Sequence, residues 1–391
     1  MQTTLISLTA GYEVIGLLGV VLIFAAYIFS RKRIVTRESF LVNERTTHWW
    51  EGSALSVMAL MGTGIFFMSA YAGVSGGLLG AVLFMLPTII AFLVFTIVAL
   101  KVKDAFPKGF SLPQYLYDRH GSQKIRTVVS LVLFLKYFAI IVLITYLGTV
   151  AVSAISAIHS GLLIFAVMVI AVLTILLSGF RSVIAASYLQ TAAVILVVLL
   201  IIPWIVGTQS ENIVVFTSHG EYLKMATLGV IVAIALVAHM VTDQFYWQQV
   251  FALERDQIKK SFGLGLVLWL CMFIGFSILG MLFAHAGGGM ASTGYMFADL
   301  VMMLTIIMVM VSTVMCSLSA VGSLWSTDMT RYNERETRAL MKYGRGDVLT
   351  AAEERILFER DKEAVQSARR AIIIMAILAG IATYLVARYI A

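Results

Sequence analysis

Charge is scarce in this sequence. Of 391 residues, 28 are basic and 21 acidic, which is 13% charged, whereas 60% are hydrophobic and the mean hydropathy is +0.95. A water-soluble domain has about a quarter of its residues charged. Apolar runs of about 20 residues, the length that crosses a bilayer as a helix, recur along the chain. The low charge excludes a soluble enzyme or a secreted protein and predicts a polytopic membrane protein.

Cysteine is almost absent. Cys271 and Cys316 both lie inside apolar runs, which excludes a disulfide framework and a Cys/His metal site. The sequence also lacks a His-Glu-x-x-His motif, and the apolar runs contain no paired carboxylates and no Ser/His arrangement of the kind that hydrolases use. These absences argue against an enzyme.

The apolar runs lack the alternating pattern of a membrane β-barrel, so the spans are expected to be helices. Of only four prolines, Pro87 is expected to kink the third span and Pro203 to close the sixth. We predict ten spans, at about 12–29, 50–78, 79–100, 125–157, 161–178, 182–206, 225–250, 261–285, 296–328 and 371–390.

The positions of the basic residues predict the orientation. If the N-terminus lies outside, all of them except Lys136, Lys224 and Arg388 fall on inner connections. Inner loops of membrane proteins are enriched in Lys and Arg. We therefore expect a multi-pass protein of the plasma or inner membrane, with its N-terminus outside and segment 330–370 in the cytoplasm. The basic residues of the inner connections then explain the pI of about 9.3, and a nucleic-acid partner is not required to explain it.

Segment 330–370 is the one stretch with soluble composition. Thr350 and Glu353 form a capping box that is expected to open a charged helix through Glu363. A solvated connector is favoured over a docking or regulatory site for a partner.

Two spans are interrupted at membrane depth. The second contains Met61-Gly62-Thr63-Gly64, and the seventh meets His239 and then Thr242-Asp243-Gln244. Irregular backbone persists at this depth only where it lines a cavity, and its recurrence in two halves of a chain is typical of the central site of a secondary transporter. Because the two spans are five apart, they predict two five-helix repeats related by inversion, with the first span peripheral.

Four motifs within residues 50–332 carry a family resemblance. Ala54–Gly77 resembles the first core helix of the sodium/solute symporter family, and Gly179–Val183 with Ser187–Gln190 is similar to the opening of the fifth. Asp243–Gln248 resembles the sixth, most closely in the urea/polyamine branch. Ser312-Thr313, upstream of Asp328–Tyr332, matches the eighth.

The resemblance implies an all-α membrane protein with the inverted five-plus-five helix repeat (LeuT-like) transporter fold. Its parts would be a peripheral N-terminal helix in 1–30, a first repeat in 46–207, and a second repeat in 225–390 that includes the linker 330–370. The tenth core helix of the family has no counterpart before residue 391. Either the sequence is truncated, or that helix comes from elsewhere, or transport has been lost.

The resemblance also implies a sodium site, with Na+ as the coupling ion. Its oxygens would be the backbone carbonyls of Val57, Leu60 and Val309 and the hydroxyls of Ser312 and Thr313. Five neutral oxygens suit a monovalent cation better than calcium, which takes carboxylates. The alternative is that the two hydroxyls bond only to the preceding turn of their own helix.

Two positions depart from the family pattern. Ala59 replaces a polar residue of the first core helix, and Ser187 replaces the Asp of the fifth. Both departures leave fewer ligands for a second ion.

Polar residues at membrane depth are costly and therefore candidates for function. Asp243 either accepts hydrogen bonds from a substrate or caps the second half-helix, and His239 either gates the path or packs between helices. Lys136 is expected to extend to the inner surface. The predicted substrate-binding or gating residues are Thr63, Phe67, Tyr137, His239, Asp243 and Gln244.

These features predict a sodium-coupled symporter that imports a small polar solute, such as urea, an amine or an amino acid, by alternating access within membrane lipid. The alternative is a transporter-like sensor or accessory subunit that binds a solute without moving it. The sequence names neither the substrate nor the ion stoichiometry nor the oligomeric state.

Overall fold

A computed structural model describes residues 6–29, 36–60, 63–209, 219–285, 296–330 and 332–389. Within these ranges the secondary structure is helical, apart from two isolated β-bridges. The longer helices are α1 (Leu8–Phe29), α4 (Thr63–Met85), α5 (Thr88–Ala105), α7 (Gln123–Ser153), α8 (Ser160–Ser178), α9 (Phe180–Leu196), α11 (His219–Thr242), α13 (Ile258–His285), α14 (Met296–Leu324) and α16 (Ala351–Tyr389). The shorter ones are α2 (Arg37–Val42), α3 (Trp49–Leu60), α6 (Leu112–His120), α10 (Ile202–Gln209), α12 (Gln244–Ala252) and α15 (Glu334–Arg345).

Nine helical stretches of the described chain are long and apolar enough to cross a membrane. One of them, Phe67–Ala105, contains a bend at Gly77, where φ is 60° and ψ is −166°, a conformation open essentially to glycine alone. Gly76 and Gly80, on either side of the bend, both face the Met225 side chain. This stretch therefore holds the end of the second predicted span and all of the third. Each of the ten predicted spans is largely helical over its described residues.

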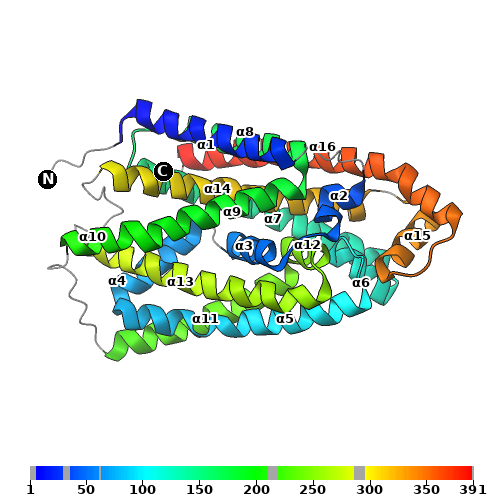
Figure 1. Ribbon diagram of the computed structural model, residues 1–391, viewed down its shortest axis with the longest axis horizontal. Coiled ribbons are helices and arrows are strands. Elements are labelled where there is room, and N and C mark those ends of the chain that lie inside the picture. The colour runs from blue at the N-terminus through cyan, green and yellow to red at the C-terminus, as the bar shows by residue number, and fades with distance from the viewer. Residues whose placement is uncertain are drawn as a thin grey trace.

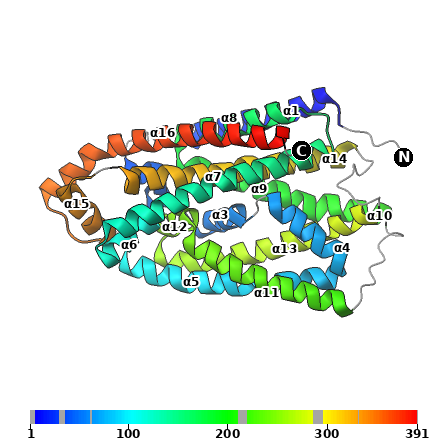
Figure 2. The same cartoon turned by 180° about the vertical axis from the view of Figure 1, so that it is seen from behind.

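The helices pack in two groups that run along the long axis of the molecule (Figures 1 and 2). One group consists of α1, α7, α8, α9, α14 and α16, and the other of α3, α4, α5, α11 and α13. Both views place the short helices α3 and α12 in the middle of the molecule. The two interrupted spans predicted from the sequence therefore meet at its centre.

The two prolines in the spans behave differently. Pro87 separates α4 from α5, as expected of a residue that cannot donate to the preceding turn. Pro203 was expected to close the sixth span, but the helix continues through Gln209, so that prediction is wrong. The chain before Pro203, Val197–Ile201, forms a π-helical turn, a wider turn of the kind found where a backbone hydrogen bond is lost.

The capping box of segment 330–370 is confirmed, because the Glu353 amide donates to Thr350 Oγ1 at 3.3 Å and the Thr350 amide donates to the Glu353 carboxylate at 2.9 Å. The helix that it opens, α16, continues without a break to Tyr389. Part of this segment packs against the same chain, since α15 buries Leu340 and Met341. Many of its residues, Val348 and Phe358 among them, are exposed. The choice between a solvated connector and a docking or regulatory site for a partner stays a prediction.

Candidate functional site

The seventh predicted span is interrupted at a single residue. α11 ends at Thr242 and α12 begins at Gln244, with Asp243 extended between them (φ −90°, ψ 118°). Asp243 Oδ1 accepts a hydrogen bond from the Phe245 amide at 2.9 Å, which is the N-cap arrangement that stabilises the start of a helix. The predicted break is confirmed here, and the capping role of Asp243 is present.

In the second predicted span, α3 ends at Leu60 and α4 begins at Thr63. Residues 61 and 62, on which part of the predicted break falls, lie outside the described residues, and so does the side chain of Thr63. The break in this span therefore stays a prediction. Val57 and Leu60, two of the predicted sodium ligands, lie in the last described turn of α3.

A cavity of about 310 Å³ lies where the interrupted spans meet α7, α13 and α14. It brings together five of the residues predicted from the sequence, namely Leu60, Tyr137, His239, Asp243 and Thr313. The other lining residues are Ala59, Met68, Phe84, Ile140, Ile144, Val232, Leu236, Phe245, Trp269, Phe273, Cys316 and Ser317. The volume is in the range of small-molecule sites.

Charged and polar groups gather on Asp243 at one side of this cavity. Lys136 Nζ lies 2.8 Å from Asp243 Oδ2, and the Tyr137 hydroxyl donates to Oδ1 at 2.9 Å. His239 Nε2 is 3.8 Å from Oδ2. The prediction that Lys136 extends to the inner surface is therefore wrong, because a buried carboxylate offers its ammonium group a partner at membrane depth.

The predicted hydroxyl pair is buried in the protein, with Ser312 1% and Thr313 6% exposed. Thr313 Oγ1 donates to the Val309 carbonyl at 2.8 Å, the bond to its own helix that the alternative interpretation expected. Ser312 Oγ lies within hydrogen-bond distance of Gln190 Oε1 on α9 and 3.2 Å from the same Val309 carbonyl. Since Ser312 has a single hydroxyl hydrogen, it can donate to only one of these two oxygens at a time.

Three residues at this site were missed by the sequence interpretation. Gln190 was noticed only as part of a motif, yet its amide oxygen meets Ser312, and its Nε2 is buried without a hydrogen-bond partner among the described residues. Trp269 and Phe273 stand in the apolar run of α13, where nothing in the local sequence separates cavity-lining aromatics from ordinary packing residues.

Two of the predicted substrate or gating residues lie away from the cavity lining. Gln244 Nε2 donates to the Phe110 carbonyl at 2.9 Å and to Ser323 Oγ at 3.1 Å, and its Oε1 accepts from the Leu112 amide at 2.8 Å. This side chain joins α12 to the chain before α6 and to α14. Phe67 is half-buried and packs against the core.

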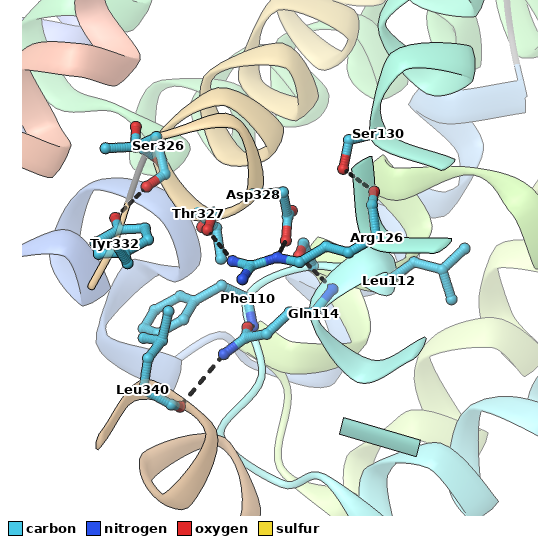
Figure 3. A network of polar contacts seen from close by, with 12 residues as sticks. Phe110, Leu112, Gln114, Arg126, Ser130, Ser326, Thr327, Asp328, Tyr332 and Leu340 are labelled. Carbon is cyan, nitrogen blue, oxygen red and sulfur yellow. Dashed lines mark hydrogen bonds and ion pairs between the residues drawn. The ribbon is translucent and has the colours of Figure 1, made fainter. Parts of the chain in front are cut away.

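A second polar network surrounds Arg126 and Asp328 (Figure 3). Arg126, at the start of α7, pairs with Asp328 at 2.9 Å, and the two side chains are 2% and 0% exposed. The same guanidinium donates to the Thr327 carbonyl. Asp328 lies in the π-helical turn Trp325–Met329 that ends α14. This ion pair joins α7 to α14 within one group of helices.

No family model and no curated protein matches this chain. Among solved structures, it is similar to a Na+-coupled sialic acid symporter in a substrate-bound, outward-open state. The TM-score is 0.69 and the identity 14%, and the alignment covers 97% of this chain and 83% of that chain. The fold is therefore the all-helical LeuT-like fold of such symporters, and the chain is a multi-pass membrane protein.

Proposed function

We propose that this protein is a sodium-coupled symporter that imports a small solute by alternating access, rather than an enzyme. The observation that carries the proposal is the cavity where the helix break at Asp243 meets α3, α7, α13 and α14, which is bordered by Asp243 and Thr313. Interrupted helices at membrane depth offer unpaired backbone groups to ions and substrates. The similarity in fold to a Na+-coupled symporter supports the same function.

The proposed sodium ligands are oxygen atoms of α3 and α14. Val57 and Leu60 lie in the last described turn of α3, and Ser312 and Thr313 lie on α14. Thr313 Oγ1 donates to the Val309 carbonyl, and the one hydroxyl hydrogen of Ser312 goes either to that carbonyl or to Gln190 Oε1. We therefore place the carbonyls of Val57, Leu60 and Val309 and the hydroxyls of Ser312 and Thr313 in the sodium site.

One sodium ion is a sufficient energy source for import. Its entry down about 100 mV releases about 2.3 kcal/mol, and a tenfold concentration gradient adds about 1.4 kcal/mol. Together these could sustain about 500-fold accumulation of a solute. Coupling requires that ion and solute stabilise the same conformation, and Leu60 and Thr313 place both ligands at one cavity.

The two groups of helices suggest which parts move. Arg126 and Asp328 hold α7 to α14 inside one group, so we propose that the group of α3, α4, α5, α11 and α13 rocks against it. The Lys136–Asp243 ion pair joins α7 to the α11–α12 junction and so spans the two groups. The distribution of basic residues supports an N-terminus outside the cell and a cytoplasmic segment 330–370.

Sodium binding can be tested by thermal unfolding of the purified full chain in detergent. We expect NaCl to raise the unfolding temperature relative to KCl, because an ion that binds only the folded state stabilises it. Ser312→Ala and Thr313→Ala should each abolish this difference. The matched control is Thr305→Ala, since Thr305 is equally buried on α14 and bonds to its own helix in the same way. Equal sodium responses in all variants would refute the assigned site.

Transport is tested separately in proteoliposomes with labelled urea, amines and amino acids. A symporter accumulates its solute only when sodium is higher outside. Binding of a solute with no accumulation under any gradient would favour a sensor or accessory subunit.

A further inference from the structure

Gln190 connects α9 to the proposed sodium site. Its side chain is fully buried, and its Oε1 atom lies within hydrogen-bond distance of Ser312 Oγ on α14. By contrast, the hydroxyl of Thr305 on the same helix donates to the Val301 carbonyl of the preceding turn at 2.8 Å. Ser312 therefore has an acceptor outside its own helix.

Burial of the Gln190 amide has a cost. Its Nε2 atom is buried with no hydrogen-bond partner among the described residues, and an unpaired buried donor destabilises the folded state. A leucine or methionine at this position would pack inside the protein without that cost. The part of the side chain that makes a polar contact is its oxygen, and that contact is with Ser312.

The direction of the Ser312 hydroxyl matters at the Val309 carbonyl. In α14, as in any α-helix, this carbonyl faces the amide four residues further on, which belongs to Thr313. Thr313 Oγ1 donates to it as well at 2.8 Å, and Ser312 Oγ lies 3.2 Å from it. Each hydrogen directed at this oxygen carries partial positive charge and repels a cation that binds there. A hydrogen from Ser312 would be the third.

We propose that Gln190 is a positioning residue of the sodium site. Its Oε1 atom accepts the Ser312 hydroxyl hydrogen and so keeps this hydrogen off the Val309 carbonyl, which leaves both oxygens better able to bind the ion. Gln190 acts through Ser312 and is not assigned as a sodium ligand. The inference rests on the proposed function and adds a residue to the same site.

Two substitutions separate the acceptor from the rest of the side chain. Gln190→Met keeps the approximate length of the side chain and removes the acceptor, so the Ser312 hydrogen returns to Val309. Gln190→Glu is the conservative variant, because a carboxyl group keeps an acceptor for the Ser312 hydroxyl.

The test is equilibrium binding of radiolabelled sodium to the purified full chain in detergent, with KCl holding the ionic strength constant. We expect the dissociation constant of Gln190→Met to be about tenfold higher than that of the parent, which corresponds to about 1.4 kcal/mol. Gln190→Glu should bind sodium at least as tightly as the parent.

Thermal unfolding in KCl alone distinguishes this role from a structural one. Gln190→Met should unfold at the temperature of the parent or above it, because an unpaired buried N–H group has been removed. A residue with only a structural role would lower this temperature and leave the sodium dissociation constant unchanged.

Gln248→Met is the matched control. Gln248 is also fully buried, and its Nε2 atom lies 3.1 Å from the hydroxyl of another α14 serine, Ser319. This variant should leave the sodium dissociation constant unchanged. Gln190→Leu provides a second variant without an acceptor if Gln190→Met fails to fold.

A sodium dissociation constant equal to that of the parent in folded Gln190→Met or Gln190→Leu overturns the inference. So does a Gln190→Glu variant that binds sodium as weakly as they do. If the parent binds no sodium, the sodium site itself is refuted, and this inference with it. If sodium binds with Gln190 dependence but no solute accumulates in proteoliposomes, symport alone is contradicted.

Discussion

At the scale of single residues, Asp243 combines three roles. Its carboxylate caps α12, balances the charge of Lys136 and forms part of the cavity wall. The sequence placed Asp243 at a helix break, because polar residues inside an apolar run are visible locally. It did not reveal Lys136 as the partner, since the two residues are 107 positions apart and their pairing depends on how the helices pack.

Asp243→Asn separates these roles, because Asn caps a helix about as well as Asp but carries no charge. The variant leaves the Lys136 ammonium without a counter-ion. Since Lys136 retains 23% exposure, we expect a loss of about 2–3 kcal/mol, below the 3–5 kcal/mol of a fully buried pair. Denaturant unfolding in detergent measures it.

The double variant Asp243→Asn with Lys136→Met removes both charges and should recover most of that stability. If the single variant is as stable as the parent, or the double variant is no more stable than the single, the ion pair contributes little to the free energy of unfolding.

At the scale of elements, Gly77 determines where the second predicted span turns into the third. The boundary predicted from the apolar runs, between residues 78 and 79, lies within two residues of it. The prediction that Pro203 closes the sixth span was wrong, because the helix continues through a π-helical turn. It also missed the burial of α15, which depends on contacts with distant segments such as the Arg345–Asp118 ion pair.

Gly77→Ala should destabilise the protein by about 1–3 kcal/mol, because a Cβ is strained at φ 60° and ψ −166°. Thermal unfolding measures the change. Gly16→Ala is the control, since Gly16 lies within α1 with open space around it, and alanine favours a helix there by up to about 1 kcal/mol. If Gly77→Ala unfolds at the same temperature as the parent protein, the chain of the variant bends at another residue.

At the scale of the whole molecule, the sequence predicted an all-helical, multi-pass membrane protein with interrupted helices at its centre, because apolar runs and their interruptions are direct consequences of the bilayer. The LeuT-like fold is confirmed. The division into repeats at 46–207 and 225–390 stays a prediction. The wall of the cavity was only partly predictable, since Trp269 looks like any other apolar residue of its helix.

The orientation in the membrane can be tested with single cysteines in a background where Cys271 and Cys316 are alanine. Glu359→Cys on α16 and Glu221→Cys on α11 both lie at exposed positions. In intact cells a membrane-impermeant maleimide should label Glu221→Cys, and Glu359→Cys only after permeabilisation. The reverse pattern would invert the proposed topology.

The length of α16 has a practical consequence. Its 39 residues span about 58 Å, roughly twice the hydrocarbon thickness of a bilayer, about 30 Å. About half of this rod therefore stands in water, continuous with the part embedded in lipid. A rigid binder or a helical fusion attached to its charged half would report the tilt of the half that lies in the membrane. The same attachment would serve as a fiducial mark for electron cryomicroscopy of the protein in a detergent micelle.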